Sequence, residues 1–398
     1  MTSLLLLIVT ARLLGELGKH WGQPALVGEL FSGILLGPAL LGLLKPTPEL
    51  GAVSNVAVFL IVLAAGMKTD LEHVMRGFSG AGVGVLLLNF FLPLAGGIAL
   101  GTAFHLGLQH TLVLGICISI TALPVAVRLL DKLGLLHSLT ARYALSAAVT
   151  SDILALLILG ALLGLGATSD QSQIAQTVGL GALKLAALAA ALALAYFGLK
   201  RLQQGPKKLE ARLDALAKRF GPESIFSLAV LFVLAFASLS ELLSFPAVIG
   251  AFFGALLLQD SHMGPRHFAR TEQTASDFSE GFLGPVFFGT LGLHFSNSAF
   301  SDLALIGGVL AVSILSKLLA GGLGCRLAGM STREAWGLGA ILNGRGVMEL
   351  VVAEVAYEHG LVDASLFSVL LLMGTVTTML APLLYGRFVP PPPKKRRA

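Results

Sequence analysis

Apolar segments long enough to cross a lipid bilayer recur along the whole length of this 398-residue chain. A helix of about 20 apolar residues spans the hydrocarbon core, where lipid-exposed backbone is satisfied only in helices or closed barrels. Charged residues make up 12% of the chain, against roughly 25% in soluble domains. The sequence therefore predicts an all-α polytopic membrane protein.

We place about 13 membrane-spanning helices, allowing roughly 17–25 residues for a typical span and accepting some shorter or longer ones. They lie at 2–17, 25–43, 52–67, 80–105, 109–131, 138–165, 174–199, 222–241, 244–259, 276–296, 300–326, 335–357 and 364–388. The turns between them carry Pro and Gly, as at 46–48 and 205–206, and these residues interrupt regular structure.

Lys and Arg fall almost entirely on one side of this topology. Of the 27 Lys and Arg residues, 22 lie in the loops, the span ends and the tail of one side, Lys45 alone lies on the other side, and four lie deeper within spans. Because cytoplasmic loops carry the Lys and Arg excess, we expect a multi-pass protein of the cell (inner) membrane with its N-terminus outside and its C-terminus cytoplasmic. The same rule explains the basic loop at 200–220, so no nucleic acid is expected as a partner.

The two halves of the chain resemble each other. The segments 24–28 (Pro-Ala-Leu-Val-Gly) and 33–36 (Gly-Ile-Leu-Leu) recur as 246–250 (Pro-Ala-Val-Ile-Gly) and 254–257 (Gly-Ala-Leu-Leu). Spans 1–6 thus match spans 8–13 in the opposite direction, which is the inverted-topology repeat of many secondary transporters. We expect a first six-span repeat at 1–165, a linker helix and basic cytoplasmic loop at 166–221, a second repeat at 222–388 and a basic cytoplasmic tail at 389–398.

Helix-breaking residues occur in spans 5 and 12, which are equivalent in the two repeats. Pro124 removes a backbone donor from span 5, and Asn343, Gly344 and Gly346 weaken span 12. Irregular backbone at membrane depth is tolerated where it is buried in protein or lines a cavity. Either break alone could be a Pro kink or a glycine packing site. Together they predict two crossed broken helices whose half-helix ends face each other.

Asp152 is the single charged residue in the apolar run at 143–165 and lies near its middle. A carboxylate at that depth costs about 2.5–3.5 kcal/mol on insertion scales, and residues of this kind commonly carry protons or cations. The alternative is a structural Asp that is hydrogen bonded between helices. Asp152 is therefore the first candidate for an ion-binding residue.

Four motifs follow one another at 22–38, at 119–125 (Ser-Ile-Thr-Ala-Leu-Pro-Val), at 316–321 (Ser-Lys-Leu-Leu-Ala-Gly) and at 343–349 (Asn-Gly-Arg-Gly-Val-Met-Glu). In this order they resemble the monovalent cation:proton antiporter superfamily. The closer similarity is to its second branch, which includes bacterial Na⁺/H⁺ antiporters, K⁺ efflux systems and plant cation/H⁺ exchangers. The resemblance covers essentially the whole chain.

This resemblance implies a homodimer, with spans 1–3 and 8–10 as a dimerising scaffold and spans 4–6 and 11–13 as a moving core. It also implies an ion site at two adjacent residues of span 6, which here are Ser151 and Asp152. The second position keeps the family's Asp, whereas Ser151 departs from the usual Asp, Asn or Gln.

Exchange of a cation for H⁺ would follow if the two ions compete for Asp152. Desolvation favours the neutral form of a carboxyl group, and a nearby cation favours the ionised form, so one site could hold H⁺ and a dehydrated Na⁺ or K⁺ in turn. Hard cations take oxygen ligands. The candidates are the Asp152 carboxylate, the hydroxyls of Ser151, Thr150 and Thr121, and carbonyls freed at the breaks. We expect access to alternate as one bundle moves against the other.

Three more charges within the spans could support this site. Lys317 resembles the family's intramembrane lysine. It could neutralise Asp152 when no cation is bound, anchor half-helix carbonyls, or extend toward the cytoplasmic side; Ser151 cannot form an ion pair with it. Arg345 and Glu349 are four residues apart and can share a helix face, so Arg345 could cap carbonyls at the crossing while Glu349 balances its charge.

Other functional classes fit less well. A K⁺ efflux channel-like system could use a crossed-helix site without proton counterflow, and a sodium-coupled organic solute carrier could use broken helices with polar pairs. An enzyme is not expected, because the Gly-Phe-Ser-Gly motif at 77–80 has no matching histidine and no His-Glu-x-x-His occurs. The two cysteines match no metal spacing, and no cofactor is expected. The expected partners are a monovalent cation, H⁺, the lipid bilayer and a second copy of the chain.

Overall fold

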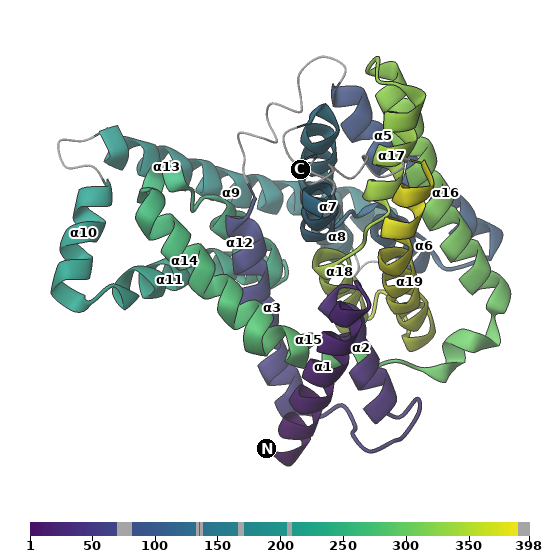
Figure 1. The fold of residues 1–398 in the computed structure, drawn as a ribbon. Helices are drawn as coiled ribbons and strands as arrows, with labels where there is room; N and C mark the ends of the chain where they lie inside the picture. Colours follow the sequence, from purple (N-terminus) through teal and green to yellow (C-terminus); the bar gives the residue numbers. More distant parts are fainter. Residues whose placement is uncertain (70–81, 133–134, 136–137, 166–170, 205–208, 389–398) are drawn as a thin grey trace, which may run out of the picture. The chain divides into compact units, whose positions relative to one another are not determined.

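The computed structural model describes residues 1–69, 82–132, 135, 138–165, 171–204 and 209–388. Within these residues every regular element is a helix (Figure 1). The expected tail at 389–398 and the Gly-Phe-Ser-Gly motif at 77–80 lie outside the described residues. The prediction of an all-helical fold is confirmed for the described part of the chain.

The helices of the first half are α1 (Thr2–His20), α2 (Ala25–Leu36), α3 (Pro48–Met67), α5 (Gly82–Ala103), α6 (Leu108–Ser119), α7 (Leu123–Lys132), α8 (Leu139–Leu165) and α9 (Gln171–Gln204). Those of the second half are α10 (Leu209–Phe220), α11 (Glu223–Leu242), α12 (Ala247–Leu256), α13 (Asp260–Met263), α14 (Pro265–Phe278), the π-helix η1 (Ser279–Leu283), α15 (Gly284–Leu293), the 3₁₀ helix η2 (Asn297–Ser301), α16 (Leu303–Leu327), α17 (Thr332–Leu342), α18 (Val347–Glu358) and α19 (Ala364–Phe388).

Six of the described helices are long and apolar enough to cross a membrane, namely α3, α5, α8, α11, α16 and α19. Three shorter helices, α2, α6 and α12, are also apolar. The expected total of 13 spans and the inverted repeat stay predictions.

Several expected helix bounds are wrong. Helix α2 ends at Leu36 rather than at 43, because Gly37 and Pro38 follow and helices usually end before a proline. Helix α14 begins at Pro265, earlier than the expected 276, and η1 continues it into α15. The expected loop at 200–220 contains α10, whose apolar positions recur at helical spacing and whose Leu213 is buried.

Contacts divide the chain into two compact units. Unit 1 consists of Met1–Ala11, Pro46–Asp70 and Gly160–Thr290, and unit 2 consists of Arg12–Lys45, Leu71–Leu159 and Leu291–Ala398. Each unit thus draws segments from both halves of the sequence. All candidate ion-site residues belong to unit 2.

Helices α5, α6, α16 and α17 of unit 2 pack through glycines. A Cβ atom added to Gly97 of α5 would lie 2.5 Å from the Cα atom of Gly115 in α6. One added to Gly321 of α16 would collide with the Cα atom of Gly339 in α17. Small residues let helix backbones approach closely in membranes. This packing places the ends of α6 and α17 beside α5 and α16 (Figure 1).

Side-chain caps start the helices that surround the site. Ser331 and Glu334 form a reciprocal capping box at the start of α17. Asp302 accepts a hydrogen bond from the Leu305 N–H at 2.8 Å before α16, and Asp363 accepts one from Leu366 at 2.8 Å before α19. These caps satisfy N–H groups that a helix leaves without partners.

Candidate ion-binding site

The first predicted break separates α6 from α7. Helix α6 ends at Ser119, and Ile120 is extended, with φ −70° and ψ 146°. Pro124 is the second residue of α7, where its missing N–H would have no helical partner in any case. The break therefore lies at 120–122, before the proline, rather than at the proline itself.

The second predicted break separates α17 from α18 at Asn343–Gly346, as the sequence indicated. The two breaks touch each other. The Ala122 N–H donates to the Gly344 carbonyl at 2.9 Å, and the Thr121 hydroxyl donates to the Leu342 carbonyl at 3.2 Å.

Glycine is needed at both contact points of the second break. A Cβ atom on Gly346 would lie 2.5 Å from the Cβ atom of Ala122, and one on Gly344 would lie 2.7 Å from Cγ1 of Val125. The two extended segments therefore cross at van der Waals distance, and a side chain at either glycine would separate them.

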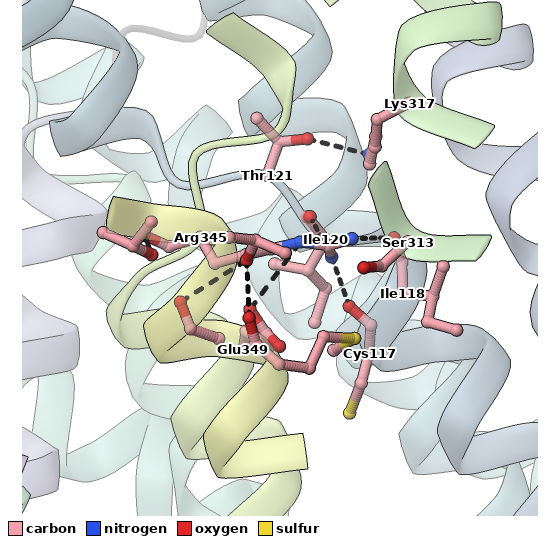
Figure 2. Close-up of polar contacts among 12 residues, drawn as sticks. Cys117, Ile118, Ile120, Thr121, Ser313, Lys317, Arg345 and Glu349 are labelled. Atoms are coloured by element: carbon pink, nitrogen blue, oxygen red, sulfur yellow. Dashed lines mark hydrogen bonds and ion pairs between the residues drawn. The ribbon is translucent and has the colours of Figure 1, made fainter. Parts of the chain in front are cut away.

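Arg345 and Lys317 together cap the carboxyl end of α6 (Figure 2). Both side chains are fully buried. Nη1 of Arg345 donates to the carbonyls of Cys117 at 2.5 Å and Ile120 at 2.7 Å, and Nη2 donates to that of Ile118 at 2.6 Å.

Lys317 completes this cap from α16. Its Nζ donates to the Ser119 carbonyl at 2.5 Å, to the Thr121 hydroxyl at 2.8 Å, and to the carbonyl and side-chain oxygen of Asn89 at 3.0 and 3.1 Å. Four successive carbonyls at the end of α6 and just beyond it, from Cys117 to Ile120, thus bind two cations, which also suit the negative end of the helix dipole. Of the roles expected for Lys317, the contact with half-helix carbonyls is the one its buried side chain makes in the structure.

Asp152 lies in α8 with 5% of its surface exposed. Its Oδ1 atom and the Thr150 hydroxyl are buried and have no hydrogen-bond partner within the described chain. Asp152 interacts electrostatically with Lys317, although the four acceptors above hold the ammonium group. One oxygen of the Asp152 carboxylate therefore has no hydrogen-bond partner among the described residues, although Asp152 follows Ser151, which contacts the break after α6.

Ser151 connects α8 to the first break. Its hydroxyl donates to the Ala148 carbonyl at 2.7 Å and accepts from the Thr121 N–H at 3.2 Å. The Thr121 hydroxyl is likewise engaged, by Leu342 and Lys317. Of the four expected oxygen ligands, Asp152 and Thr150 have free acceptor capacity, whereas Ser151 and Thr121 hold the crossing together.

Glu349 and Asn343 complete the buried polar set. Oε2 of Glu349 lies 3.9 Å from Nε of Arg345, and neither carboxylate oxygen has a hydrogen-bond partner in the described chain. Asn343 donates to the Gly339 carbonyl at 2.9 Å, while its Oδ1 atom is buried without a partner among the described residues. Arg345 and Glu349 thus lie side by side as expected, but they do not share a helix face, because α18 begins at Val347 and Arg345 lies in the break before it.

Sequence reasoning missed two residues that hold this arrangement. Asn89 of α5 binds Lys317, and Thr378 of α19 donates to the Arg345 carbonyl at 2.8 Å. Asn89 could have been found, because it is the single amide side chain in the apolar segment 82–103. Thr378 gives no comparable signal, because hydroxyls are common in apolar helices and bond to their own backbone.

Comparisons with known proteins find antiporters that match almost the whole chain. The chain is 27% identical to the Na⁺/H⁺-K⁺ antiporter GerN of Bacillus cereus over 378 residues, which cover 95% of this chain and 93% of that protein. It is 28% identical to a Na⁺/H⁺ antiporter of Enterococcus hirae over 389 residues, which cover 97% of each.

A solved structure shows the same fold. The sodium proton antiporter MjNhaP1 of Methanocaldococcus jannaschii superposes with a TM-score of 0.68 at 16% identity, covering 97% of this chain and 95% of that one. The model of the family described as sodium/hydrogen exchanger, transmembrane, matches residues 3–389. This all-helical, multi-pass membrane protein belongs to that sodium/hydrogen exchanger family.

Proposed function

We propose that this protein is a secondary transporter that exchanges a monovalent cation, Na⁺ or K⁺, for H⁺ across the cell membrane. The names of its relatives support both cations. The observation that carries the proposal is the crossing of the two breaks. There, Lys317 and Arg345 bind carbonyls at the end of α6, and Asp152 keeps a buried oxygen that has no hydrogen-bond partner among the described residues.

Asp152 is the proposed carrier, binding H⁺ and the cation in turn. A dehydrated cation at its Oδ1 atom could also be approached by the Thr150 hydroxyl, the second buried oxygen without a partner in the described chain. Ser151 and Thr121 act first by holding α8 against the break. These two hydroxyls become ligands of the cation only if their present hydrogen bonds break.

Lys317 is proposed to attract the ionised form of Asp152 while anchoring α6. The two groups interact electrostatically, and a bound cation would compete with that interaction. Arg345 is proposed to be structural, because its guanidinium binds three carbonyls and Glu349 lies beside it.

The larger arrangement follows from the same proposal. About 13 membrane spans form two inverted six-span repeats at 1–165 and 222–388. Their linker lies at 166–221 and a tail at 389–398. The N-terminus is outside, the chain forms a homodimer, and access to Asp152 alternates between the two sides. The Lys and Arg asymmetry and the fold shared with MjNhaP1 support this arrangement.

Proteoliposomes carrying a pH-sensitive dye test the function. Adding Na⁺, K⁺, Li⁺ or Rb⁺ outside should release protons from vesicles with the wild-type protein. Asp152→Asn should abolish this flux, and Asp277→Asn, the same change at an exposed position of α14, should leave it unchanged. Retained exchange in Asp152→Asn would remove Asp152 as carrier. Cation flux without proton counterflow would favour the channel-like alternative.

A further inference from the structure

Unit 2 contains an apolar cavity of about 570 Å³ that none of the proposed ion-site residues lines. Its walls come from the second half of α1, from α2, from the segment around η2 and from one face of α19. Membrane-protein helices seldom leave such a volume empty without an occupant, because a void forfeits the contacts of its lining atoms.

The lining excludes an ionic cargo. Among the described residues that form it, none carries a charge, and the polar ones are Gln23, Asn297 and Thr375. Asn297 already donates to the Ala39 carbonyl, and Thr375 to the Leu371 carbonyl, each at 2.8 Å. A dehydrated cation would find almost no oxygen ligands here, and apolar cavities stay dry and take apolar guests. The occupant must therefore be apolar.

The cavity borders the surface that a membrane protein presents to lipid. Its lining residues Leu17, Phe31, Leu40 and Phe300 are between 43% and 58% exposed. One water takes about 30 Å³ in the liquid, so this cavity has room for roughly 19 groups of that size. A single acyl chain fits this volume and is the most abundant apolar molecule at such a surface.

Two residues of the lining have the polarity that a lipid's polar end requires. Trp21 is largely exposed, and tryptophan prefers the headgroup level of a bilayer. The neighbouring Gln23 has a buried Oε1 atom without a hydrogen-bond partner in the described chain. A hydrogen-bond donor on the lipid's polar end can satisfy this oxygen.

From these observations we propose that the cavity binds one acyl chain of a membrane phospholipid. The lipid would fill the space between α2 and α19 and contribute to the packing of unit 2.

If the proposed transport function holds, this lipid also acts on transport through α19. The helix lines the cavity with Leu371, Leu372 and Thr375. From the same helix, Thr378 donates to the Arg345 carbonyl and Gly374 packs against the Glu349 carboxylate. An acyl chain against α19 would thus limit how far the helix behind the crossing can move.

Bromine-labelled phosphatidylethanolamine, whose ammonium group can donate a hydrogen bond to Gln23, tests the binding in detergent. The chain has two tryptophans, so Trp336→Phe leaves Trp21 as the single reporter at the cavity. We expect quenching that saturates at one lipid per chain. We expect native mass spectrometry of the wild-type protein to find one retained phospholipid.

Leu372→Phe and Ile34→Phe, made in the single-tryptophan background, fill the cavity and should weaken the saturable quenching at least tenfold. Leu231→Phe adds the same ring at an exposed position of α11 outside the cavity and should bind lipid normally. Asp152→Asn should bind it too, which separates this proposal from the transport function. Quenching that does not saturate, equal binding in all variants, detergent alone in the mass spectra, or a second copy of the chain cross-linked at the cavity would overturn the proposal.

Discussion

Replacing Arg345 by Met tests whether the capped end of α6 holds the crossing together. The guanidinium is fully buried and donates to the carbonyls of Cys117, Ile118 and Ile120 at 2.5–2.7 Å. Methionine is unbranched and apolar, and it can donate to none of them. The substitution therefore removes the side-chain donors of three buried carbonyls and the cation beside Glu349.

The expected loss of stability follows from these contacts. A hydrogen bond to a charged group contributes about 1.5–3 kcal/mol in soluble proteins, whereas interhelical bonds in a membrane average about 0.6 kcal/mol. Breaking one side of a buried ion pair costs about 3–5 kcal/mol. Because all three bonds and the pair are lost together, we expect Arg345→Met to lower the free energy of unfolding by about 3–5 kcal/mol.

Denaturation of the detergent-solubilised protein, followed by tryptophan fluorescence, measures this loss. Arg270→Met makes the same change at an exposed position of α14 and should cost less than about 0.5 kcal/mol. Adding Glu349→Leu to Arg345→Met should recover about 1 kcal/mol or more, because neighbouring buried charges are coupled. If Arg345→Met were as stable as Arg270→Met, the carbonyl cap would not stabilise the fold and the reasoning would fail.

Three further outcomes are expected. Gly346→Ala should lower the free energy of unfolding by about 1–3 kcal/mol and slow cation/H⁺ exchange in proteoliposomes. The reason is that its new Cβ atom would lie 2.5 Å from the Cβ atom of Ala122. Adding Ala122→Gly should restore both, and Gly307→Ala, where no atom lies within 4 Å, should be neutral or stabilising. Asn89→Leu should cost about 1–3 kcal/mol in the same denaturation assay, because the Lys317 ammonium loses a buried acceptor; an unchanged midpoint would contradict this. If H⁺ and the cation compete at Asp152, the apparent KM for the cation should rise as pH falls, by at most about tenfold per pH unit; a KM independent of pH would exclude a shared site.

The sequence predicted those parts of the site that depend on local composition. Helix breakers are recognisable within a few residues, so both broken segments were found, and the second one at the right residues. Charges within apolar segments are equally visible, so Asp152, Lys317, Arg345 and Glu349 were identified before any contact was known. The first break was misplaced toward Pro124, because a proline marks a helix start as readily as a helix interruption.

Tertiary structure decided which partner each of these groups has. The bonds from Arg345 to Cys117 and from Lys317 to Asn89 each join residues 228 positions apart, and no local pattern encodes such a pairing. The hydroxyls of Ser151 and Thr121 fit an ion as well as a backbone group, and only the folded chain shows that they bind the crossing. The sequence alone determined a helical membrane protein with costly buried charges. The fold determined that the two cations bind carbonyls at a helix end and that, in the described part of the chain, an Asp152 oxygen has no hydrogen-bond partner, because hydrogen-bond geometry depends on which helices meet.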